Sequence, residues 1–147
     1  MAVAVAVVIR KALHASRHQI FDAWTQAHQV NQWLFFSPHT KTKTKIDFRV
    51  KGKYSLEMMN EGSSTVVHQG EYQIIIPNEK IIFTWELENS AREIDGDTVV
   101  TVDFEDSGAS TQMVLIHQLL PTEELRSQYE RDWRTALVRL EQFLMGD

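Results

Sequence analysis

The chain has no cysteine among its 147 residues, which excludes disulfide bonds, thiolate metal ligands and a thiol nucleophile. Its six glycines and three prolines form no phosphate-binding loop, dinucleotide fingerprint or nucleophile elbow, so no cofactor is predicted. No apolar run approaches the ~18 residues that a membrane-spanning helix needs, and no membrane partner is expected. The lack of cysteine fits a reducing compartment, so the sequence predicts a cytoplasmic protein.

Acidic residues outnumber basic ones, with twenty Asp and Glu against fifteen Lys and Arg, for a formal net charge of −5. Phosphate backbones repel such a chain, so a nucleic-acid partner is not expected. The length suits one full hydrophobic core, and we expect a single domain over residues 1–147. The six histidines include no helical i, i+4 pair with a third ligand nearby, so no metal site is predicted.

Alternation of apolar and polar side chains predicts seven strands. Residues 1–9 alternate alanine and valine with no basic segment before them, which indicates a buried strand ending near Leu13 rather than a signal peptide. Six more segments show a two-residue period, separated by turns that include Asn60–Gly62, Asp95–Gly96 and Ser107–Gly108. They cover about 45–51, 54–58, 65–76, 81–87, 98–104 and 113–117.

Three helices are predicted around these strands. Ser16 and Gln19 form a capping box for a short helix, and a second short helix contains Val30 and Trp33. A long helix runs from about Thr122, its N-cap, to Met145. Its apolar stripe consists of Leu125, Tyr129, Trp133, Leu137, Leu140 and Leu144. The order is one strand, two short helices, six strands and a long helix, which predicts an α+β fold with the helix covering a curved antiparallel sheet.

This order of elements resembles the START-like helix-grip (SRPBCC) superfamily. Within it, the chain is similar to the group named for homologues of the ninety-kilodalton heat-shock protein ATPase activator. The residues that carry the resemblance are Ile20–Thr25, Trp33, Gly52–Tyr54, Gly70–Tyr72, Pro77, Phe83–Trp85, Thr98–Phe104, His117, Leu120–Pro121, Asp132–Trp133, Leu137, Leu140 and Leu144.

The resemblance implies about seven antiparallel strands wrapped around the C-terminal helix, with a cavity between them. Members bind lipids, sterols or aromatic polyketides, some cyclise or hydrolyse them, and others bind protein partners. Candidate cavity residues here are Trp33, Phe36, Phe48, Tyr54, Leu56, Met58, Phe83, Trp85, Val102, Met113, His117, Tyr129, Trp133 and Leu137. A plain packed core needs the same residue types, so each of them is also consistent with core packing alone.

His117 is the polar residue among these candidates. It lies two residues after Leu115 and four after Met113 on the predicted strand, so its side chain is expected to point to the same inner face. It could act as a general base or form a hydrogen bond to a ligand. The interpretation that we favour is a structural histidine hydrogen-bonded to a backbone carbonyl. His39 is a candidate for the pocket mouth or a solvated loop residue. Catalytic residues are not predicted.

Three functions remain open. The leading hypothesis is non-catalytic binding of a small, mostly apolar ligand, lipid-like or aromatic, between the sheet and the last helix. The second is a protein-interaction module with a homodimer or chaperone partner, and the third is a cyclase- or hydrolase-type enzyme using the same cavity. The protein-interaction module would use a stripe of basic residues as its binding surface. The simpler interpretation is that these residues only form a solvated outer face of the sheet. This stripe is predicted to lie on one strand face and consists of Lys41, Lys43, Lys45, Arg49, Lys51 and Lys53.

Overall fold

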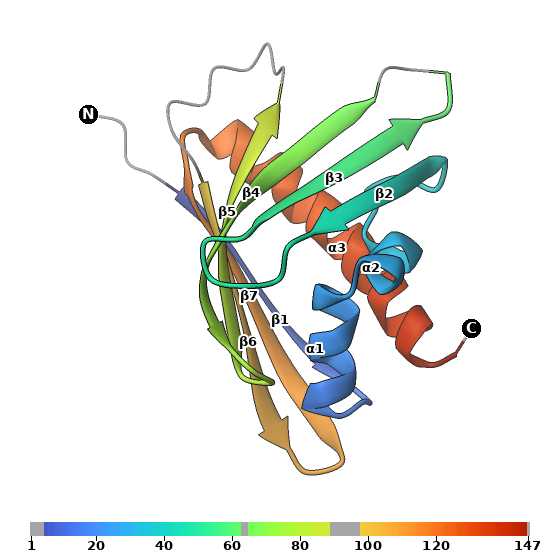
Figure 1. Cartoon of the computed structure of the whole chain (residues 1–147), viewed down its shortest axis with the longest axis vertical. Coiled ribbons are helices and arrows are strands. Elements are labelled where there is room, and N and C mark those ends of the chain that lie inside the picture. Colours follow the sequence, from blue (N-terminus) through green and yellow to red (C-terminus); the bar gives the residue numbers. More distant parts are fainter. Residues whose placement is uncertain (1–4, 63–64, 89–97, 147) are drawn as a thin grey trace.

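The computed structural model describes residues 5–62, 65–88 and 98–146. The elements follow the predicted order: β1 (Val5–Leu13), α1 (Arg17–Thr25), α2 (Ala27–Trp33), β2 (Thr40–Ile46), β3 (Lys53–Asn60), β4 (Val66–Ile76), β5 (Lys80–Glu88), β6 (Thr98–Ser107), β7 (Ser110–Leu120) and α3 (Glu123–Leu144). The α+β fold class and the seven-stranded sheet are thereby confirmed (Figure 1). The expected turn at Asp95–Gly96 lies outside the described residues.

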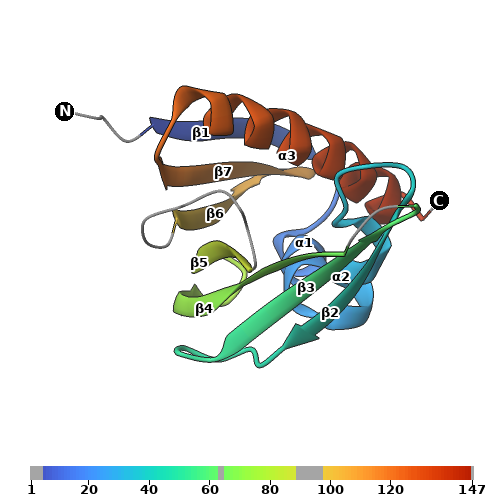
Figure 2. The same ribbon diagram turned by 90° about the horizontal axis from the view of Figure 1, so that it is seen from above.

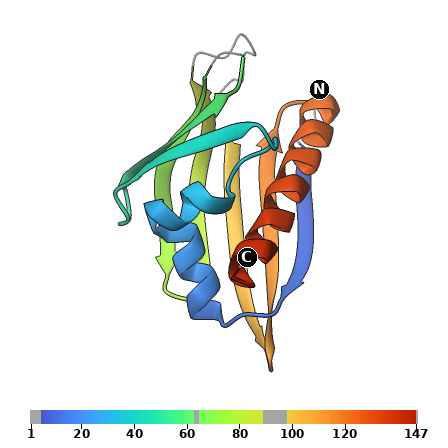
Figure 3. The ribbon, with the colours of Figure 1, turned by 90° about the vertical axis from the view of Figure 1, so that its right-hand side faces the viewer.

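All seven strands form one antiparallel sheet in the order β1-β7-β6-β5-β4-β3-β2. The sheet curls strongly when it is seen from above, with α3 alongside β1 and β7 (Figure 2). Helices α1 and α2 lie in the opening between α3 and the β2–β3 end, as a view from the side also shows (Figure 3). The hydrophobic core therefore lies inside the curl, against all three helices.

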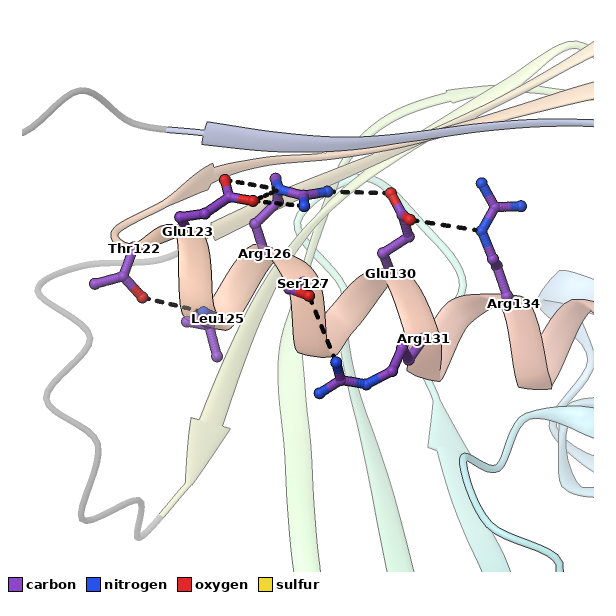
Figure 4. A network of polar contacts seen from close by, with 8 residues as sticks. All are labelled: Thr122, Glu123, Leu125, Arg126, Ser127, Glu130, Arg131 and Arg134. Atoms are coloured by element: carbon purple, nitrogen blue, oxygen red, sulfur yellow. Dashed lines mark hydrogen bonds and ion pairs between the residues drawn. The ribbon is translucent and has the colours of Figure 1, made fainter.

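Local sequence explains where the helices begin. The Gln19 amide N–H donates to Ser16 Oγ over 3.1 Å, and the Ser16 N–H donates to Gln19 Oε1 over 2.9 Å, which confirms the capping box. In α3 the Leu125 N–H donates to Thr122 Oγ1 over 3.1 Å (Figure 4). Each cap satisfies a backbone donor that has no partner within its helix.

The two faces of α3 differ as the periodicity predicts. Its buried face carries Leu125, Tyr129, Trp133, Ala136, Leu137 and Leu140. On another face Arg126 bonds Glu123 over 2.6 Å and Glu130 over 3.1 Å, and Arg134 lies 3.7 Å from Glu130 (Figure 4). Such i, i+3 and i, i+4 pairs contribute only a few tenths of a kcal/mol each, so the buried stripe anchors the helix.

The predicted strand over residues 45–51 is wrong in its position. Strand β2 is Thr40–Ile46, and residues 47–51 form the turn to β3, in which Lys51 has a φ of 68° and Val50 is 52% exposed. Ile46 pairs with Tyr54, so the chain between them must reverse. Arg49 therefore lies in a turn and not on a strand. Of the basic stripe predicted for one strand face, β2 carries only Lys41, Lys43 and Lys45, which are exposed.

A glycine allows the sharp curvature near the middle of β4. Gly70 pairs with Tyr54 of β3, and a Cβ on Gly70 would lie 2.0 Å from the backbone oxygen of Thr84. The Tyr54 hydroxyl donates to that same oxygen, and the Thr84 hydroxyl accepts from the Glu71 N–H over 2.9 Å. Only glycine permits this close approach of two strands, which helps to explain why the sheet bends here.

Candidate ligand cavity

An aromatic cluster fills the space inside the curled sheet. The Trp85 ring of β5 is at its centre, with ring centroids 5.1 Å from Trp133 of α3 and 4.6 Å from His68 of β4. The Phe36 ring, from the segment between α2 and β2, meets Trp133 edge-on at 5.6 Å and His68 edge-on at 5.8 Å. Both tryptophans are fully buried, whereas Phe36 is only half-buried. Edge-to-face and offset contacts of this kind favour a well-ordered aromatic interior.

His117 lies within this cluster and belongs to a chain of side-chain hydrogen bonds. The Trp133 indole N–H can only donate, and it lies 3.1 Å from His117 Nδ1. His117 Nδ1 must therefore accept, which places the ring proton on Nε2, facing the Thr98 hydroxyl at 2.7 Å. Thr98 in turn donates to the Trp85 carbonyl over 2.6 Å. The three bonds fix one neutral tautomer of His117.

This arrangement decides what His117 can do. Its side chain is 0% exposed, and burial, with the nearby His68 as a smaller cause, lowers the pKa of His117 to about 3. Protonation at Nδ1 would also break the bond from Trp133. The expected partner, a backbone carbonyl, was wrong: two side chains satisfy the ring instead. A sealed, neutral and doubly bonded imidazole fits a structural role better than that of a general base.

A small void remains beside the cluster, with a volume of about 20 Å³. A space of this size holds about one water molecule. Its lining comes from α1, α2 and the residue after it, and strands β2 to β5, so it lies under the two short helices rather than under α3. The lining residues are Trp24, Val30, Leu34, Ile46, Tyr54, Leu56, Tyr72, Ile81, Phe83 and Trp85.

The fourteen predicted cavity residues all lie in or against the core. Twelve are buried: Trp33, Tyr54, Leu56, Met58, Phe83, Trp85, Val102, Met113, His117, Tyr129, Trp133 and Leu137. Phe36 and Phe48 are half-buried and pack against the same core. Only Tyr54, Leu56, Phe83 and Trp85 line the void. His39 is exposed and does not line the void; its imidazole lies 4.0 Å from the Glu61 carboxylate.

Sequence reasoning left several polar interior residues out of this set. His68 shares the inward parity of Tyr72 in β4, and Thr98 shares that of Val100 in β6, so strand alternation alone could have found both. The threonines of β2 alternate with its exposed lysines, and Thr42 and Thr44 are each 8% exposed. Burial lowers the pKa of His68 to about 4, so this second interior histidine is also neutral at pH 7.

Within the described residues, no helix is long and apolar enough to cross a membrane. The same part of the chain brings together no group of three His, Asp or Glu side chains that could hold a metal ion.

The curled antiparallel sheet, its long C-terminal helix and the aromatic interior between them define a START-like helix-grip protein. The family described as "Activator of Hsp90 ATPase homolog 1-like protein" matches residues 14–145, and the chain belongs to this family. A search of curated proteins finds no match. Family membership fits a module that binds a ligand or another protein.

Several solved structures share the fold. A protein from Chromobacterium violaceum is 18% identical, with a TM-score of 0.85 over 97% of this chain and 98% of that one. An uncharacterized protein from Rhizobium leguminosarum is 24% identical, with a TM-score of 0.83 over 100% and 98%. A protein from Arthrobacter aurescens is 20% identical, with a TM-score of 0.83 over 97% and 87%. At these identities the likeness concerns the fold alone.

Proposed function

We propose that this protein binds a small, mostly apolar ligand without transforming it, in the aromatic interior between the curled sheet and its helices. The observation that carries the proposal is the interior itself, where aromatic rings from β4, β5, α3 and the segment before β2 meet in one cluster, beside a residual void that Trp85 lines. Sites for apolar small molecules are lined in this way, by rings with a few polar groups among them. A cytoplasmic location belongs to the same proposal.

Binding requires the interior to open, because the void of about 20 Å³ is far smaller than a ligand pocket of roughly 300 Å³ or more. The Phe36 ring is the natural part to move. It is half-buried, it comes from a segment between two elements, and it touches His68, Trp85 and Trp133. Turning this ring outward would expose the cluster without separating any pair of strands.

The enzyme alternative has less support from the geometry. The interior histidine considered as an acid or base, His117, is sealed from solvent and holds both ring nitrogens in hydrogen bonds. A general base must reach the proton that it removes, which this imidazole does not.

Native mass spectrometry of freshly purified protein, against a denatured control, tests the binding proposal. We expect an added mass above the 17.0 kDa chain that denaturation removes. The Phe36→Ala variant should exchange this mass faster when it is incubated with cell extracts of lipids and aromatic compounds. Bare protein, before and after such incubation, in both the natural chain and the variant, would refute ligand binding.

A protein-interaction module is the second candidate, favoured by one observation. Strand β2 is at the edge of the sheet and projects Lys41, Lys43 and Lys45 into solvent. This surface suits an acidic partner, such as a chaperone, or a second copy of this acidic chain. A purified partner should lose binding when Lys43 and Lys45 are changed to Glu, whereas the same changes should leave ligand binding intact.

A further inference from the structure

The outer face of the sheet carries aliphatic side chains where a sheet that faces water usually carries polar ones. Strands β2 and β3 follow that rule, with Lys43, Ser55 and Glu57 pointing outward. The other five strands do not. Their outward side chains form an outer aliphatic patch that consists of Val8, Ile74, Ile76, Ile82, Val99, Val114 and Ile116.

The strand register makes this patch continuous. Ile74 of β4 pairs with Ile82 of β5, which pairs with Thr101 of β6. Thr101 pairs with Ile116 of β7, and Ile116 pairs with Val8 of β1. Ile74 is 43% exposed and Val8 is 48% exposed. All three helices lie on the inner side of the sheet, so no helix or strand that the structure describes covers the patch (Figure 3).

The sequence of these strands is typical of strands that are covered on both faces. Residues 74–76, 81–83 and 113–116 are continuous apolar runs, whereas β2 and β3 alternate apolar and polar side chains. Continuous runs occur where both faces of a sheet are buried, as in a sandwich of two sheets. We therefore expect a second surface to cover the outer aliphatic patch.

The charges beside the patch indicate what that surface is. One row along the strands from Ile82, Lys80 of β5 pairs with Asp103 of β6, and their side chains form an ion pair of 3.5 Å. A two-fold axis parallel to the strands, between β5 and β6, would place Lys80 over the partner's Asp103 and Asp103 over the partner's Lys80. The same axis would place Ile74 over the partner's Ile116. The face is therefore complementary to a second copy of itself in both charge and apolar character.

We propose that the outer aliphatic patch is a homodimer interface, in which the sheets of two copies pack face to face about this axis. Sheets packed in this way lie about 10 Å apart, with strand directions within about 30° of each other. The inference does not depend on the proposed ligand, because the aromatic cluster lies on the opposite face of the sheet. It is also separate from the lysines of β2.

The size of the patch sets the expected strength of the dimer. Five strands about 4.8 Å apart, with three rows of outward side chains about 7 Å apart, cover about 500 Å². Two copies together would bury about 1,000 Å², which is the lower limit for a specific interface. We therefore expect a dimer that dissociates in the micromolar range.

Analytical ultracentrifugation of the full chain tests the proposal. The average mass should rise from 17.0 kDa at low micromolar concentration toward twice that value at several hundred micromolar. Ile74→Glu should keep the mass at 17.0 kDa, because it would bury a carboxylate against the partner's Ile116. Val138→Glu is the matched control, because Val138 is 49% exposed and lies on α3. This control should dimerise like the natural chain.

A mixing experiment tests the position of the axis. In its own homodimer, Lys80→Asp would gather four carboxylates at the axis, and Asp103→Lys would gather four ammonium groups there. Each variant alone should therefore dimerise at least about tenfold more weakly than the natural chain. An equimolar mixture of the two should form a one-to-one dimer, because opposite charges again face each other.

The outcomes that would overturn the proposal are distinct. A mass of 17.0 kDa for the natural chain at every concentration would overturn the homodimer. Dimerisation of Ile74→Glu as strong as that of Val138→Glu would show that the interface lies on another surface. A mixture that associates no more strongly than its separate variants would overturn the axis. The mixing experiment does not involve Ile74, so it remains decisive if Ile74→Glu fails to fold.

Discussion

Acidification should destabilise this protein through its two buried histidines. Burial lowers the pKa of His68 to about 4 and that of His117 to about 3, from an ordinary value of 6.5. Below pH 6.5 these two histidines bind protons in the unfolded chain but stay unprotonated in the folded protein. The free energy of unfolding therefore falls as the pH falls. The stability that the two neutral histidines contribute is fully present above pH 6.5. It is lost progressively as the pH falls toward about 4 for His68 and about 3 for His117.

The expected size follows from about 1.4 kcal/mol per pH unit for each histidine. Between pH 7.5 and pH 5.0 each group loses about 2 kcal/mol, and the pair about 4 kcal/mol. The other four histidines, His14, His18, His28 and His39, are exposed. Most carboxylates keep their charge above pH 5, because their ordinary pKa is near 4. The two interior histidines should therefore dominate the change in this range.

Urea unfolding followed by tryptophan fluorescence at pH 7.5 and pH 5.0 measures the effect, which should lower the midpoint by about 2 M. The His68→Phe variant should show only half of the loss, about 2 kcal/mol, because one titrating group has been removed. Equal free energies of unfolding at the two pH values would refute the reasoning. A full loss of about 4 kcal/mol in His68→Phe would show that other groups cause it.

Two further predictions use matched variants, with the free energy of unfolding in urea at pH 7.5 as the measurement. Thr42→Val should lower the free energy of unfolding by about 1 kcal/mol, because it removes the hydrogen bond from the Thr42 hydroxyl to the Leu34 carbonyl. Thr44→Val should leave the free energy of unfolding unchanged or raise it slightly, because the Thr44 hydroxyl has no partner among the described residues. Equal losses would contradict this difference in hydrogen bonding. Gly70→Ala should lose about 3 kcal/mol because its Cβ would meet a backbone oxygen 2.0 Å away. Gly62→Ala, with a φ of 75° and open space around it, should lose about 1 kcal/mol, and the reverse order would refute the close approach at Gly70.

Much of the fold could be predicted from the sequence because its signals are local. Alternation predicted the inward side chains of β5, β6 and β7, and the four-residue spacing in α3 predicted the buried stripe through Trp133. Ser16 and Gln19 fixed the start of α1 within one turn. The exception was β2, where alternation continued past Ile46 into residues that form a turn, because pairing with β3 rather than periodicity sets the end of that strand.

The sequence predicted that the candidate residues lie in or against the core, but not which of them line the void. Parity correctly placed His117 inside but could not show what it bonds, because its partners are 19 residues before it and 16 residues after it. The small size of the void is likewise a result of packing among several elements. The extent of the domain over residues 1–147 stays a prediction.

The sequence by itself determined the order and class of the elements, the inward side of β5, β6 and β7, and the absence of thiol chemistry. The tertiary structure alone decided which polar atoms inside the curl find partners. Hydrogen bonding depends on distances of a few tenths of an ångström between side chains far apart in the chain, and no local pattern encodes them. This explains why Thr42 and Thr44, alike in sequence and burial, differ in whether their hydroxyl groups are paired.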